Sequence, residues 1–171
     1  LPGGDEEAEQ ARYRWVRDFL NAAKDRDLDA VAITDHHDLC LAQYAQSLNH
    51  AEHEFQSMWF FPGMEITCDD AAQCLAIFDV DFSLYRAQRL YGGILKDVSE
   101  PDPHAPTCGQ AELCGQDIVP LISTVKDDSE LGNNVILLPH AGQEGHKTVL
   151  RHGYHKRFAS LPSDGVYCEH P

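Results

Sequence analysis

The chain has 171 residues, and its 28 acidic and 13 basic side chains give a formal net charge of −15 at pH 7. A surface of this charge repels nucleic acid over most of its extent, which excludes wholesale binding of that kind. No apolar run reaches the roughly 18 residues that span a bilayer, and the first residues lack the basic and apolar regions of a signal peptide. Composition therefore predicts a single domain over residues 1–171, cytoplasmic, without membrane contacts and able to attract divalent cations.

Hydrophobic periodicity divides the chain into helices and strands that largely alternate. The predicted elements, in chain order, are a helix over 5–27, a strand over 30–34, a helix over 39–55, a strand over 58–66, a strand over 75–78, a helix over 84–96, a helix over 110–130, a strand over 135–138, a helix over 147–160 and a strand over 165–168. Residues 97–109 contain three prolines and are expected to form a variable surface loop or to mark a gap. This alternation predicts an α/β fold with a mainly parallel sheet.

Two prolines are expected to disturb predicted elements. Pro62, followed by Gly63, should break and bend the strand over 58–66, because proline cannot donate to a strand ladder. Pro120 should kink or break the helix over 110–130.

Three predicted strands end on side chains that bind metals. The strand over 30–34 leads into Asp35 and His36, the second strand delivers Glu65, and the strand over 135–138 delivers His140. The carboxyl ends of parallel strands meet at one edge of a sheet, so these side chains are expected to converge. Mixed imidazole and carboxylate ligands suit zinc, manganese or iron, and the pattern therefore predicts a metal site of His36, Glu65 and His140.

The neighbouring polar residues allow more than one interpretation. Asp35 is a candidate ligand, a candidate acceptor that orients His36, or the N-cap of the next helix. His37 and Asp38 fit helix capping better than metal binding. His170 follows the strand over 165–168. It is equally expected to be a further metal ligand or to lie outside the metal site.

The second predicted helix contains two further histidines, which are also of a type that binds metal ions. His50 and His53 lie three residues apart, which is not the spacing of a zinc-protease HExxH motif. They are interpreted as solvated helix residues.

A basic stretch over 146–157 contains no acid, in contrast to the rest of the chain. Lys147, Arg151 and Arg157 are candidates for a phosphate clamp beside the predicted metal site, and the alternative is an ordinary solvated helix. The six cysteines form no CxxC pair and fit no zinc finger, so they are interpreted mostly as reduced, buried thiols rather than as a disulfide framework.

Three segments together resemble the PHP family, the polymerase and histidinol phosphatase phosphoesterases. They are Ile33-Thr34-Asp35-His36, Pro62-Gly63-Met64-Glu65-Ile66-Thr67 and Leu138-Pro139-His140. The resemblance implies a distorted (β/α)7 barrel with up to three metal ions at the carboxyl ends of its strands. It also implies that His36, Glu65 and His140 bind metal, with Asp35 adjacent.

The sequence departs from the PHP pattern in two ways. The HxH pair of the first strand and the Asp-x-His pair of the last strand are missing, so the barrel is expected to be incomplete at both ends, as in a fragment of a longer protein. Gln73 and Cys74 occupy the region where the family has another histidine. The metal centre is therefore either completed by missing ends or degenerate.

A finer resemblance rests on residues 34–39 together with residues 75–79. These segments are similar to PHP domains joined to ATPases of the ABC or SMC type, a group associated with nucleic-acid processing and antiphage defence. The resemblance implies a phosphoesterase that uses metal-activated water, with Mn²⁺, Zn²⁺ or Fe²⁺, and acts as a nuclease on DNA or RNA within an ATPase-linked system. Alternatives are a small-molecule phosphatase of the histidinol-phosphatase type, or a degenerate module with a scaffolding or regulatory role; an oligomer is possible in each case.

Overall fold

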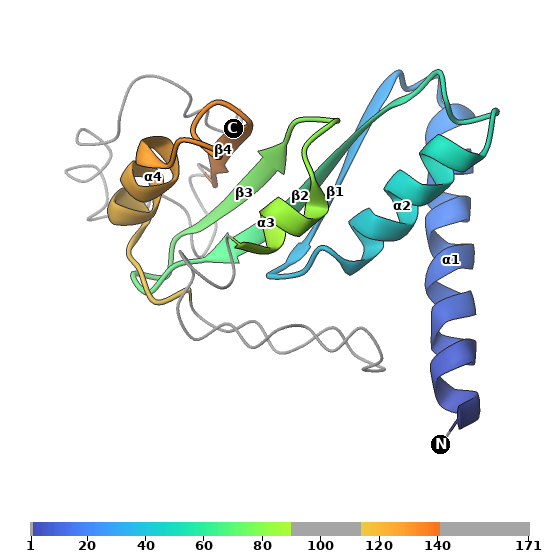
Figure 1. Cartoon of the computed structure of the whole chain (residues 1–171), viewed down its shortest axis with the longest axis horizontal. Coiled ribbons are helices and arrows are strands. Elements are labelled where there is room, and N and C mark those ends of the chain that lie inside the picture. Colours follow the sequence, from blue (N-terminus) through green and yellow to red (C-terminus); the bar gives the residue numbers. More distant parts are fainter. Residues whose placement is uncertain (1, 90–113, 141–171) are drawn as a thin grey trace.

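The structure is a computed structural model that describes residues 2–89 and 114–140. Its centre is a four-stranded sheet in the order β1-β2-β3-β4, with helices packed beside it (Figure 1). The strands are β1 (Ala30–His36), β2 (Trp59–Thr67), β3 (Gln73–Phe78) and β4 (Val135–Pro139), and the helices are α1 (Pro2–Lys24), α2 (Cys40–Ala51), α3 (Leu84–Arg89) and α4 (Ile118–Asp127). The predicted loop over 97–109, helix over 147–160 and strand over 165–168 lie outside the described residues.

The directions of the strands correct the predicted fold class. β1 and β2 are parallel, but β2 and β3 are antiparallel, as are β3 and β4. The described part of the chain therefore forms an open mixed sheet, and the prediction of a mainly parallel sheet in a distorted (β/α)7 barrel is wrong. The physical reason lies in residues 68–72, which join β2 to β3 and are too few for the crossover that parallel neighbours need.

The two faces of the sheet differ in their environment. Successive side chains of a strand alternate between faces, and Phe60, Met64 and Ile66 of β2 are all buried. We call this side the helix face, because α2 packs against β1 and β2 and α1 packs against α2 (Figure 1). On the other side, the open face, Trp59 of β2 is 60% exposed and Ile136 of β4 is 46% exposed.

Neither proline disturbs its element as predicted. β2 runs without a break through Pro62, which pairs with Ile33 of β1. Pairing with β3 begins one residue later, at Gly63, so on that side there is no ladder bond for the proline nitrogen to lose. Pro120 lies in the first turn of α4, where backbone N–H groups have no partner within the helix.

An aspartate between β1 and α2 forms a hydrogen bond with the start of the helix. Asp38 Oδ1 accepts a 2.8 Å hydrogen bond from the backbone N–H of Cys40, the first residue of α2. Asp38 is only 5% exposed. This contact supports the interpretation of Asp38 as a capping residue, since it satisfies one of the free N–H groups at the helix start. Among the described helices, none has the length and apolar character needed to cross a membrane.

Candidate functional site

Three of the strands deliver their carboxyl ends to the same edge of the sheet. β4 is antiparallel to β3, which is antiparallel to β2, so β4 runs in the same direction as β1 and β2. The end of β1, the end of β2, the end of β4 and the start of β3 therefore share one edge (Figure 1). His36, Glu65 and His140 all lie at this edge, as the strand endings predict.

His36 and Glu65 form the centre of the site. They are opposite each other in the parallel register of β1 and β2, so both side chains project from the open face. His36 Nε2 lies 3.3 Å from Glu65 Oε1. The side chain of Glu65 is 14% exposed and that of His36 is 48% exposed, so the pair is reached from solvent through the imidazole.

Gln73 is a third member of this cluster that the strand pattern did not identify. Its Nε2 lies 3.2 Å from His36 Nε2 and donates a 3.0 Å hydrogen bond to Thr67 Oγ1. Gln73 is 7% exposed at the first position of β3. The missed signal is its position: the start of an antiparallel strand lies at the same edge as the ends of its neighbours. Gln73 also occupies the region where the PHP resemblance leads one to expect a histidine.

His37 supports the site from behind and was assigned only as a possible helix cap. Its backbone has a left-handed conformation with φ of 50°, and it is 5% exposed. Its N–H donates to the Glu65 carbonyl at 2.9 Å, and its Nε2 accepts from the Thr67 N–H at 2.8 Å. His37 therefore joins the end of β1 to the backbone of β2 at Glu65 and Thr67, next to the site.

His140 lies at the same edge, but two strands, β2 and β3, lie between it and His36. Its backbone N–H donates to the Gln73 carbonyl at 2.9 Å, which extends the pairing of β3 and β4 by one residue. Neighbouring strands lie about 4.8 Å apart, so the backbones of residues 36 and 140 are separated by about 14 Å. In residues 2–89 and 114–140 there is no group of three or more His, Cys, Asp and Glu side chains that could hold a metal ion. The open sheet thus brings the side chains of His36 and Glu65 together, and His140 lies apart from this pair.

Asp35 lies on the opposite side of the sheet from His36. It pairs with Met64, which is fully buried on the helix face. Its Oδ2 is buried and has no hydrogen-bond partner among the described residues. Burial raises the pKa of Asp35, and the nearby charge of Asp38 raises it further, whereas His36 acts in the opposite direction. The surroundings of Asp35 therefore disfavour its ionised form, and the side-chain contact described at the start of α2 comes from Asp38 instead.

The described cysteines are free thiols, as the spacing predicted. Cys68, Cys74 and Cys114 are fully buried. The pKa of Cys114 is raised by its contact with Cys68 and by burial. A thiol with a raised pKa is a poor nucleophile, so Cys114 is unsuited to covalent catalysis. Lys147, Arg151, Arg157 and His170, the remaining predicted site residues, lie outside the described residues.

Comparison with known proteins gave no relative. A scan against protein-family models, a search of curated proteins and a search of solved structures each returned no match. Conclusions about function therefore depend on the chemistry of the side chains at this edge.

Proposed function

We propose that the chain is a metal-dependent phosphoesterase whose divalent ion is held by His36 and Glu65. The observation that supports this is the 3.3 Å separation of His36 Nε2 and Glu65 Oε1. Imidazole nitrogen and carboxylate oxygen each bind Zn²⁺ or similar ions at about 2.0–2.2 Å, so two such ligands on one ion lie roughly 3.0–3.4 Å apart. The donor set and its spacing fit Mn²⁺, Zn²⁺ or Fe²⁺.

Gln73 supplies a third ligand if its amide turns over. Rotation by about 180° exchanges the amide nitrogen and oxygen, and the oxygen then faces the position beside His36 Nε2. Thr67 Oγ1 can donate to that amide oxygen or accept from its nitrogen, so either orientation keeps a partner. The side chains thus provide nitrogen, carboxylate and amide ligands, and His140 lies further along the same edge.

The reaction we propose is hydrolysis of a phosphate ester. His36 and Glu65 would hold the divalent ion, which would supply Lewis-acid activation of the phosphate ester and of a water molecule. The contacts of His37 hold the backbone that carries Glu65, which supports a fixed position for this residue at the site. The exposure of His36 leaves the approach from the open face accessible to a substrate.

For the substrate we propose DNA or RNA, within a system that includes an ATPase, as the PHP resemblance implies. Lys147, Arg151 and Arg157 follow β4 in sequence and are proposed to neutralise phosphate charge. Four free cysteines among the described residues agree with a cytoplasmic location, where thiols stay reduced.

One observation favours a second candidate, a non-catalytic PHP-like module that scaffolds a larger assembly. Gln73 is a weaker metal ligand than the histidine expected in its region, and the described residues provide no group of three strong ligands. Metal content distinguishes the two functions, because a scaffold has no need of a tightly bound ion.

The test compares the full 171-residue chain with His36→Ala and Glu65→Gln variants, and with His53→Ala as a control at an exposed histidine away from the site. We expect the parent protein and the control to bind at least one Mn²⁺ or Zn²⁺ per chain and to hydrolyse bis(p-nitrophenyl) phosphate and single-stranded DNA. Both site variants should lose metal affinity and turnover by at least about tenfold.

Three outcomes would count against the proposal. They are equal turnover in the site variants, turnover that persists after chelation with EDTA, or less than one bound ion per chain together with no hydrolysis. A His140→Ala variant with full activity would limit the site to His36 and Glu65. Preference for p-nitrophenyl phosphate over DNA would identify a small-molecule phosphatase.

A further inference from the structure

The open face of the sheet has a polar zone and an apolar zone. At the edge that carries the proposed metal site, the side chains of His36, Glu65 and Gln73 are polar. Away from this edge the strand residues that the register places on the same face are mostly apolar: Ala30, Ala32, Trp59, Phe61, Leu75, Ile77, Ile136 and Leu138. Of the described strand residues on this face, only His36 and Glu65 are ionisable. An uncharged apolar surface therefore leads to the proposed site.

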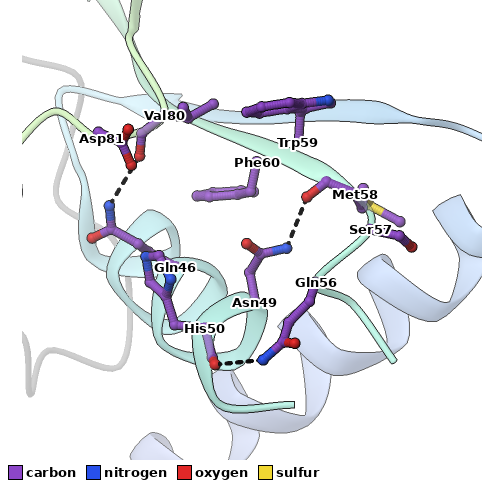
Figure 2. A pocket seen from close by; sticks show the side chains of 10 residues that line it. All are labelled: Gln46, Asn49, His50, Gln56, Ser57, Met58, Trp59, Phe60, Val80 and Asp81. Carbon is purple, nitrogen blue, oxygen red and sulfur yellow. Dashed lines mark hydrogen bonds between the residues drawn. The ribbon is translucent and has the colours of Figure 1, made fainter. Parts of the chain in front are cut away.

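Two aromatic side chains of β2 belong to this apolar zone. Trp59 and Phe61 are two residues apart, so they project from the same face with a spacing of roughly 6.6 Å along the strand. Figure 2 shows that Trp59 and Phe60 leave the β2 ribbon in opposite directions, with Phe60 directed to the pocket beside α2 and Trp59 away from it. Trp59 is 60% exposed and Phe61 is partly buried. A ligand on the open face can therefore contact both rings.

The exposed area decides what kind of ligand fits this zone. A tryptophan side chain has an area of up to about 250 Å², so Trp59 exposes roughly 150 Å². Ile136 adds a smaller area, since it is 46% exposed. A stable protein interface covers about 800 Å² of each partner, which is far more than these side chains offer. One or two planar rings cover an area of the observed size.

We propose that Trp59 and Phe61 form a stacking surface for the bases of a single-stranded nucleic acid. Unpaired bases stack on aromatic side chains of exposed sheets, whereas a duplex keeps its bases inside the helix. Phe61 precedes Glu65 by four residues, so about 13 Å of strand separates the stacking surface from the proposed metal site. The bases next to the cleaved ester then lie over β2. This inference rests on the proposed function, because it names the form of nucleic acid that the site accepts.

The distribution of charge determines how the strand is held. The net charge of −15 repels phosphates over most of the surface, but the stacking surface itself carries no charge. No lysine or arginine lies in the described strands, so contact with them releases few counterions from the nucleic acid. Affinity at this surface therefore comes from the bases, and it should change little with salt concentration.

The test measures binding without hydrolysis. The full chain is titrated in EDTA with a labelled oligothymidylate, with an abasic strand of the same length and with the corresponding duplex. We expect the oligothymidylate to bind at least about tenfold more tightly than either, because only its bases are free to stack. Raising NaCl from about 50 to 200 mM should weaken this binding less than threefold, unlike binding through phosphates.

Variants of the two tryptophans supply the controls. Trp59→Ala should weaken binding of the oligothymidylate by about tenfold, and Trp59→Phe, which keeps a ring, should retain most of the affinity. Trp15→Ala is the matched control, since Trp15 of α1 is 50% exposed and lies outside the sheet. In a chain carrying Trp15→Phe, Trp59 is the only tryptophan, and the bound strand should quench its emission. A merely structural role of Trp59 would not produce this signal.

Equal affinity for the abasic strand and the oligothymidylate would overturn the proposal, as would tighter binding of the duplex. Because the binding measurements contain EDTA, their outcome is separate from that of the proposed function. A chain that binds the oligothymidylate but does not hydrolyse DNA with Mn²⁺ has the stacking surface without the catalytic site. A chain that hydrolyses bis(p-nitrophenyl) phosphate but shows no preference for single strands has the catalytic site without the stacking surface. Circular dichroism of Trp59→Ala distinguishes lost binding from lost folding.

Discussion

At the scale of single residues, this edge of the sheet combines a close histidine–glutamate pair with a carboxyl group whose ionised form is disfavoured by burial. His36 and Glu65 face each other on the open side, and Asp35, one residue away, is turned to the helix face with an unpartnered oxygen. Functional sites often contain groups whose local energy is unfavourable and is offset by the rest of the fold. Asp35 has this character.

The pKa shift of Asp35 predicts how stability depends on pH. Its pKa is raised in the folded protein from an ordinary value of 3.8, so the folded state binds its proton more tightly than the unfolded state. The stability linked to this proton is fully present below pH 3.8 and is lost as the pH rises through the folded-state pKa. At pH 7 the Asp35 carboxyl group therefore makes the fold less stable than it is below pH 3.8.

An Asp35→Asn variant should consequently have a higher Tm than the parent at pH 7, and the difference should shrink as the pH falls toward 4. Thermal denaturation followed by circular dichroism between pH 4 and pH 7 measures this. Asp29→Asn, at an exposed position before β1, is the matched control and should change little. An Asp35→Asn protein less stable than the parent at pH 7 would show that the carboxylate has a stabilising partner.

Part of the site could be predicted from the sequence alone. His36 and Glu65 could be predicted because each lies at the end of a strand. Their place at the strand end is the same in the predicted barrel and in the observed open sheet. Gln73 and His37 were not identified, since their roles come from contacts across strands. Glutamine at the start of a strand has no distinctive pattern, and the left-handed conformation of His37 cannot be inferred from a histidine that lies between His36 and Asp38.

At the scale of elements, β2 lies between β1 and β3, and at Gly63 both neighbouring strands come close to its backbone. A Cβ atom built on Gly63 would lie 2.8 Å from Thr34 Cγ2 and 3.0 Å from the Ala76 carbonyl oxygen. The first atom belongs to β1 and the second to β3, so any side chain here separates the strands on both sides.

A Gly63→Ala variant is expected to lose about 1–3 kcal/mol of unfolding free energy, the usual range for overpacking. Urea denaturation measures the loss. Thr34→Ser, which removes Cγ2, should recover part of it in the double variant, because the contact with the Ala76 carbonyl remains. If Gly63→Ala were as stable as the parent, the strands would be further apart than described.

The elements were easier to predict than their directions. The strands over residues 30–34, 58–66, 75–78 and 135–138 all correspond to observed strands, since each is a short apolar run. Their relative direction depends on the lengths of the connections and on long-range pairing. The predicted strands over 58–66 and 75–78 leave a link too short for a crossover helix, but the prediction followed the PHP resemblance and took the sheet to be mainly parallel.

At the scale of the whole molecule, the excess of acidic side chains sets the electrostatic balance. A net charge of −15 favours the unfolded state through self-repulsion. In the described residues, Arg17 of α1 pairs with Glu52 and Glu54, and Lys24 pairs with Glu54; all these side chains are partly exposed. Such pairs each contribute about 0–1 kcal/mol, so screening them costs little.

Raising NaCl from low concentration to about 0.5 M should therefore increase the Tm of the chain, because screening weakens repulsion more than it weakens the ion pairs. Differential scanning calorimetry measures the change. A variant with Glu6→Gln, Glu7→Gln and Asp18→Asn, all exposed positions, should respond less to salt. A Tm that falls as NaCl is added would mean that attraction between opposite charges contributes more to stability than repulsion between acidic side chains removes.

The hairpin of β2 and β3 also has a kinetic consequence. In an unfolded chain the cost of closing a loop grows with the logarithm of its length, so bringing β3 to β4 across residues 79–134 costs about 2 kcal/mol more than bringing β2 to β3 across residues 68–72. The hairpin is thus suited to act as a folding nucleus, with β4 docking late. Glu65 would then reach its place early during folding, and the chain segment bearing His140 would join it last.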